Sequence, residues 1–338
     1  MSKKRLDYID FTKGIAIILV IFAHSLAFAD IPRAIIFSFH MPLFFICSGI
    51  TGKPIKNSTG VAIKIVSLIK KTIAPVLLVY LIYAFSELFG NFTQNFSWSF
   101  AKRKIVGLLF SLGQDEKILG SKVESIGMLW FLVTFFFAQL IYLLVKLINN
   151  KNVQTLVILI IAIIGFIVGK KIILPFDLDI AMVMTLFLLG GWFYRKYIDN
   201  HFNNGIVTVI SLLVWGLTFF AIYYLKNHYL IVSERSYPIF PFSLLTAFAG
   251  TLVIIGIGKY ICSFKIIKPI NIIGKYSIRL FIIHALDLYW SKIFNITNSK
   301  YVNGIVRVAV DLLVLIFVSI IINRVKVYRD EKSVQKIK

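Results

Sequence analysis

Lys13 and His24 are the two residues of the first apolar stretch whose types and spacing could do chemistry. They stand eleven positions apart, which on a helix is three turns plus about 20°, so both lie on one face, about 16 Å apart along the axis. An imidazole with an ordinary pKa of about 6.5 can accept a proton at neutral pH. Each residue also has a purely structural interpretation: Lys13 as an interfacial anchor, and His24 as a packed, hydrogen-bonded histidine.

His40 and His284 are expected at about the depth of His24, roughly 8–9 Å below the outer membrane surface if each stretch is helical. Ionisable groups inside a bilayer are costly and are functional candidates by default. The pattern predicts a shared polar cavity in the outer half of the membrane. His40 precedes Met41-Pro42, so it could instead satisfy a backbone group freed by the proline. Acidic residues fall in the outer halves of other stretches as well: Glu87, Asp287 and Asp311.

The elements that must position these residues are apolar stretches of membrane-spanning length. Hydrophobic residues make up 59% of the 338 and charged ones only 15%, whereas soluble domains carry about 25% charged residues. A spanning helix needs about 20 apolar residues. The sequence therefore predicts a single all-α integral membrane domain over 1–338, with about ten transmembrane helices near 11–29, 34–50, 72–90, 126–148, 153–169, 178–196, 206–225, 239–260, 270–290 and 303–323.

The net charge of +22 is interpreted as membrane topology rather than nucleic-acid binding, because the basic residues stand between apolar stretches. With the N-terminus inside, the inner segments hold 23 Lys and Arg and the outer ones 12. The excess predicts that both termini are cytoplasmic. The segment FAKRKIVGLLFSL is predicted to be an interfacial helix. Cys47 and Cys262 have no disulfide or metal-ligand spacing, so no metal is expected.

Several motifs follow one another along nearly the whole chain. They are DYIDFTKGIAIILVIFAHS (7–25), FHMPLFFICSGI (39–50), Lys70-Lys71 with Pro75, GMLWFL (127–132), LFLLGGWFYRK (186–196) and IGKYSIRLFIIH (273–284). In this order they resemble acyltransferase family 3, a family of integral-membrane acyltransferases. The likeness is greatest to the fucose 4-O-acetylase-like group, although Lys13 stands where many relatives have arginine.

The resemblance implies transfer of an acetyl group from cytoplasmic acetyl-CoA, a co-substrate rather than a bound cofactor, to a hydroxyl of a cell-surface glycan or its lipid-linked precursor. It also implies a multi-pass protein of the bacterial plasma membrane. His24 is the expected general base, and a covalent acetyl-histidine is the alternative. Asp10, Glu87 or Asp287 could orient its imidazole, with His40 and His284 as further assisting residues. The cations expected to bind the phosphates of the donor are Lys13, Lys53, Lys70 and Lys71.

Two other functional classes stay open from the sequence. A glycan or lipid transporter or flippase would predict inverted repeats and broken helices near the membrane midplane, and no paired halves are visible. A non-catalytic scaffold or sensor would not explain why Lys13 and His24 lie on the same helix face.

Overall fold

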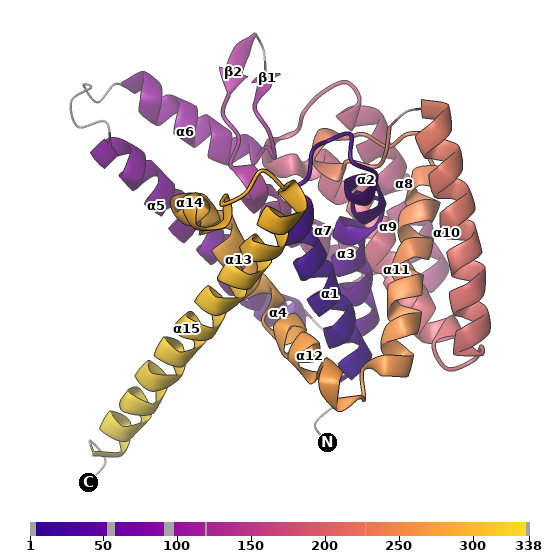
Figure 1. The fold of residues 1–338 in the computed structure, drawn as a ribbon. Helices are drawn as coiled ribbons and strands as arrows, with labels where there is room; N and C mark the ends of the chain where they lie inside the picture. The colour runs from indigo at the N-terminus through magenta and orange to yellow at the C-terminus, as the bar shows by residue number, and fades with distance from the viewer. Residues whose placement is uncertain (1–4, 53–57, 91–97, 119, 227, 336–338) are drawn as a thin grey trace.

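Helices account for 79% of the chain in the computed structural model, which describes residues 5–52, 58–90, 98–118, 120–226 and 228–335. Long apolar helices form a bundle in which the beginning of α1 and the end of α15 lie on the same side (Figure 1). The prediction of an all-α integral membrane protein is confirmed. The number of crossings and the side on which the termini lie stay predictions.

Helix α1, Asp7–Ala23, packs against most of the elements that build the candidate site. Its partners are α3 (His40–Thr51), α11 (Phe242–Ile261), α12 (Lys268–Lys275), α13 (Ser277–Leu286) and α15 (Lys300–Gln335). The α1 and α12 backbones touch at Gly14 and Gly274. A Cβ atom on Gly274 would lie 1.7 Å from the Asp10 carbonyl oxygen, and one on Gly14 would lie 2.2 Å from that of Ile270. Only small residues permit such an approach between membrane helices.

A second group of helices packs around α9, Leu178–Phe193, which contacts α3, α7 and α8. At the α3–α9 crossing, Gly49 and Gly191 again bring two backbones together. Helix α10 covers α11, and only 17% of its span is buried inside the protein, against 61% for α11. The apolar outer faces of α8 and α10 are therefore suited to contact lipid. The bounds are α7 Trp130–Val145, α8 Lys151–Gly169 and α10 Asn204–Lys226.

Each of the ten predicted stretches overlaps helix, but not every one is a single long helix. Eight helical segments are long and apolar enough to cross a membrane in the part of the chain that the structure describes. Helix α1 has 17 residues, slightly fewer than a typical span. The 270–290 stretch is divided among α12, α13 and a 3-10 turn, Asp287–Trp290. Residues 34–50 form α3 together with α2, Ile31–Phe37.

The first predicted span ends earlier than expected, at Ala23 instead of residue 29. Local hydrogen bonds hold the chain in a loop after that point. The Asp30 side chain accepts from the Ala27 N–H (2.7 Å), and Arg33 donates to the Leu26 carbonyl (2.8 Å). His24 therefore sits at the end of α1, not inside a longer helix.

Three other elements complete the fold. Helix α4, Ser58–Lys71, was not predicted and precedes α5, Ile73–Gly90, which matches the third stretch. Helix α6, Trp98–Phe110, includes all but the last two residues of the predicted interfacial segment. It is followed by a hairpin of β1, Glu116–Ile118, and β2, Ser121–Val123, with Glu116 opposite Val123.

Replacing Gly274 by alanine is expected to destabilise the fold, because its Cβ would overlap the α1 backbone. Overpacking costs about 1–3 kcal/mol, so we expect the Gly274→Ala protein to melt several degrees lower in detergent. Gly216→Ala in α10 is the matched control, since a Cβ there meets nothing within 4 Å. Equal melting temperatures for the two variants would contradict the close α1–α12 crossing.

Candidate active site

His24 lies at the end of α1, where it forms part of the walls of two cavities. The larger has a volume of about 410 Å³. Its lining is predominantly polar and comes from the loop after α1, the segment after α13 and the start of α15. The polar residues around it are Ser25, Asp287, Ser291, Asn295, Asn298, Lys300, Asn303 and Arg307.

The second cavity is a narrow apolar pocket of about 40 Å³ beside His24, and it reaches Val20 one turn earlier on α1. Apolar and aromatic side chains make up most of its wall, and His40 and Ser233 contribute polar atoms. His24 is the one residue that lines both cavities among the described residues that form them. The apolar wall includes Phe37, Met41, Met128, Trp130, Ile231, Val232 and Phe281.

His284 packs beside His24, with 5.3 Å between the ring centroids. It is fully buried, and its Nδ1 lies 2.8 Å from Asp287 Oδ2 and 3.2 Å from Asp311 Oδ2. Ionised carboxylates only accept hydrogen bonds, so Nδ1 carries the proton. In neutral His284 the Nε2 atom then has a free electron pair. That atom is buried and has no hydrogen-bond partner among the described residues.

Side chains on α15 and in the turn after α13 donate hydrogen bonds to the two carboxylates. Arg307 donates through Nε to Asp287 Oδ2 (2.5 Å) and through Nη2 to Oδ1 (2.9 Å). Trp290 donates its indole N–H to Asp311 Oδ1 at 3.4 Å. Carboxylate, imidazole and a second imidazole therefore stand in sequence, an arrangement that fixes the orientation of the His284 ring.

His284, Asp287 and Asp311 offer ligand atoms within 4.8 Å of one another, which is close enough to hold a metal ion. The set fits a metal poorly, because the Arg307 guanidinium already binds both oxygens of Asp287. A divalent cation would have to displace or adjoin that positive charge. We interpret the three residues as a hydrogen-bonded relay.

His40 is buried at the break between α2 and α3. Its Nδ1 donates to the Ile36 carbonyl at 3.0 Å, and its ring packs on Phe37 with 4.5 Å between centroids. The bond to the carbonyl agrees with the structural interpretation of His40, while its place in the apolar pocket keeps it near His24.

Asp10 lies at the opposite end of α1 from His24, so the suggestion that it orients the His24 imidazole is wrong. Fourteen residues of helix separate the two, about 21 Å along the axis. Asp10 is buried and pairs with Arg5 and with Lys13, whose Nζ lies 3.1 Å from Asp10 Oδ1. Its contacts make it a partner of Lys13 instead.

The structure describes only some of the other residues predicted for the site. Lys70 and Lys71 form the exposed last turn of α4. Lys53 and the side chain of Glu87 lie outside the described residues.

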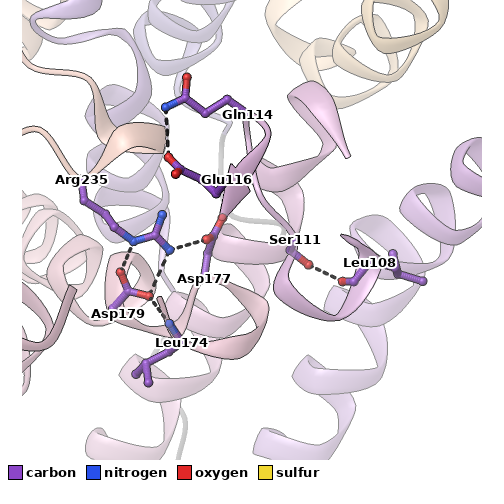
Figure 2. A network of polar contacts seen from close by, with 8 residues as sticks. All are labelled: Leu108, Ser111, Gln114, Glu116, Leu174, Asp177, Asp179 and Arg235. Atoms are coloured by element: carbon purple, nitrogen blue, oxygen red, sulfur yellow. Dashed lines mark hydrogen bonds and ion pairs between the residues drawn. The ribbon is translucent and has the colours of Figure 1, made fainter. Parts of the chain in front are cut away.

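A buried ion cluster fixes the loop that closes the apolar pocket (Figure 2). Arg235 follows Val232 and Ser233, and it donates to Asp179 Oδ2 (2.6 Å) and to Asp177 Oδ1 (2.7 Å). The Asp179 Oδ1 atom also accepts from the Leu174 N–H. Because these bonds tie the loop to the beginning of α9, the pocket wall is held by charge pairing as well as by packing.

One comparison with known proteins decides the family. The model of the acyltransferase family 3 domain, described as an acyltransferase domain, matches residues 6–324. The chain belongs to acyltransferase family 3. No curated protein and no solved structure matched it. The match confirms the family indicated by the sequence motifs, without specifying the subgroup.

Two charged residues of this candidate site, Asp311 and Arg307, have no role in the prediction from the sequence. The sequence marks Asp311 only by its depth and gives Arg307 no role. They stand four positions apart on α15, a spacing that places two side chains on one helix face. That spacing is the signal that could have indicated a shared site.

Arg307→Gln is expected to destabilise the acyltransferase strongly, because it leaves Asp287 buried without its cation. Removing one partner of a buried pair costs about 3–5 kcal/mol. Thermal unfolding in detergent measures the effect. Arg279→Gln is the control, because Arg279 is exposed, stacks on the Tyr276 ring and has no ion pair with a described residue. Equal destabilisation by both variants would refute the assigned pairing.

Proposed function

We propose that this acyltransferase moves an acetyl group from cytoplasmic acetyl-CoA to a hydroxyl of a cell-surface glycan or its lipid-linked precursor, in a bacterial plasma membrane. The observation that supports it most is the position of His24 between a polar cavity and an apolar pocket. A sugar needs hydrogen-bonding walls, whereas an acyl thioester needs an apolar one. One imidazole can serve both only at such a boundary.

In the proposed reaction His24 is the general base. It takes the proton from the acceptor hydroxyl while the hydroxyl oxygen attacks the thioester carbonyl carbon. The carbon–sulfur bond breaks, the acetyl group becomes an ester on the sugar, and the coenzyme A thiolate receives the proton back from His24. Atoms and charge balance without any further reactant.

His284 is proposed as the positioning residue for His24. Its ring adjoins that of His24, and its own orientation is fixed by Asp287 and Asp311. A carboxylate pair behind His284 stabilises positive charge in the site while His24 holds the proton. The Nε2 atom of His284 is buried and has no partner among the described residues, so in this proposal it acts on the neighbouring His24 ring and not on the substrates.

Acceptor binding is proposed for the polar cavity. Three asparagines in its lining, Asn295, Asn298 and Asn303, offer amide groups that both donate and accept, as sugar hydroxyls do. Lys300 reaches the same cavity and pairs with Asp30, which ties the start of α15 to the loop after α1.

Donor binding is proposed at the start of α1. Lys13 lies about 16 Å from His24 along the helix, a distance comparable with the length of a pantetheine arm. Its ammonium is partly exposed and held by Asp10. Lys70 and Lys71 are exposed cations suited to phosphate, and Lys53 is proposed with them from the sequence alone.

His24→Ala is expected to reduce acetyl transfer to background, with normal amounts of protein in the membrane. A general base contributes about 10²–10⁴-fold to the rate. The measurement is transfer of labelled acetyl from acetyl-CoA by the purified protein, together with mass spectrometry of the glycans of a deletion strain.

His201→Ala is the matched control, because His201 is exposed in a loop, and it should retain full activity. Retained activity of the His24→Ala protein would refute the catalytic assignment. Transport of a glycan by the purified protein without acetylation would favour a transporter.

His284→Gln is expected to lower kcat by about 100-fold, since loss of the second imidazole removes assistance to a general base. The KM values for both substrates should change little, because His284 lies behind His24 and outside the linings of both cavities. The pH–rate profile should also shift. An unchanged kcat with an unchanged profile would contradict the positioning role.

A further inference from the structure

Three lysines surround a single tryptophan at the end of the bundle where α1 begins. The Nζ atoms of Lys146, Lys196 and Lys151 lie 4.4, 5.1 and 5.4 Å from the Trp192 ring centroid. They come from the end of α7, from the π-helix Tyr194–Ile198 that follows α9, and from the first residue of α8. Residues far apart in the sequence are thus gathered around one ring.

Their positive charge is not compensated by any carboxylate of the described residues. The nearby Asp199 is already occupied, because Arg195, Lys259 (2.6 Å) and the Tyr8 hydroxyl (2.9 Å) bind it. Burial lowers the pKa of Lys146 to about 8, and repulsion by Lys151 and Lys196 adds to the shift. Such a cluster gains stability from an anion.

The surroundings of the cluster are apolar and exposed. Leu144 and Leu147 flank Lys146, and Val153 and Leu156 follow Lys151 on α8, all of them at least 42% exposed. Only 22% of the α8 span is buried. Tryptophan and lysine together are typical of the membrane–water interface, so the anion that fits here has apolar chains attached to it.

A second feature favours a ligand at this place. The chain after Trp192 forms a π-helix over Tyr194–Ile198, and π-helical turns occur frequently at functional sites. The beginning of α8 adds further positive potential, since a helix N-terminus favours anions. The Tyr142 hydroxyl, beneath Lys146, is buried without a partner among the described residues.

We propose that Lys146, Lys151 and Lys196 around Trp192 bind the phosphate headgroup of an anionic phospholipid. The ammonium groups contact the phosphate, the indole ring lies at headgroup level, and the acyl chains follow the exposed apolar face of α8. Basic pockets between membrane helices bind anionic headgroups in this way. The site is separate from the His24 cavities, and the inference does not rest on acyl transfer.

The test compares lipid retention by the purified full-length protein in native mass spectrometry. The lipids are phosphatidylglycerol and phosphatidylcholine, offered at equal concentration. The wild-type protein should retain phosphatidylglycerol preferentially. A triple variant, Lys146→Gln with Lys151→Gln and Lys196→Gln, should lose that preference at least tenfold.

The matched control removes three exposed lysines near the same end of the bundle, with Lys265→Gln, Lys268→Gln and Lys275→Gln. It should retain the preference, which separates a specific site from a loss of overall charge. Equal retention of both lipids by the wild-type protein would overturn the proposal, as would an equal loss in the control.

Competition identifies the source of the phosphate. Inorganic phosphate and acetyl-CoA are added separately at millimolar concentration. Retention of phosphatidylglycerol in the presence of each of these anions supports a lipid site. Displacement by either would overturn the lipid assignment and indicate a site for a soluble anion.

Discussion

A charge inside this apolar bundle must have a partner, and most of the architecture around the candidate site follows from that requirement. Burying an isolated carboxylate among apolar helices is prohibitively costly. Asp10, Asp199, Asp179 and Asp287 are all buried, and each binds at least one cation from another turn or another helix. The pairs of Asp199, Asp179 and Asp287 join separate elements. Asp10 pairs within α1 and with the segment directly before it.

The same requirement explains the geometry of the candidate active site. Arg307 on α15 must reach Asp287 at the end of α13, and this fixes the two helices relative to each other. With Asp287 held, the imidazole of His284 is fixed one turn earlier on α13. The glycine contacts between α1 and α12 then bring the end of α1 to the same place, so that His24 meets His284. The positions of the two rings therefore depend on two independent constraints, the Arg307–Asp287 ion pair and the close contact of the α1 and α12 backbones.

The sequence predicts the helices well, because hydropathy reports directly on the surface that must avoid water. It also predicts that Lys13 and His24 share a face and that His284 lies at a depth similar to His24, since both follow from the helical rise. It could not predict that α1 ends at Ala23, because the side-chain bonds of Asp30 and Arg33 decide that boundary. Nor could it place Asp10, since helix adjacency and the choice of ion-pair partner depend on tertiary packing.

Counting the cations in the sequence does not reveal what each of them binds. Their distribution predicts a side of the membrane, yet their partners divide them into groups with different physical roles. Arg235 and Arg307 neutralise buried carboxylates and so belong to the fold. Lys146, Lys151 and Lys196 surround an aromatic ring, and none of them pairs with a carboxylate of the described residues, which leaves their charge available to a ligand. Lys13 lies between these groups, because Asp10 orients its ammonium while part of it stays exposed. A lysine held in this way loses less side-chain entropy when it binds a phosphate, and this favours Lys13 over the exposed Lys70 and Lys71 of α4 as the first contact of the proposed anionic donor.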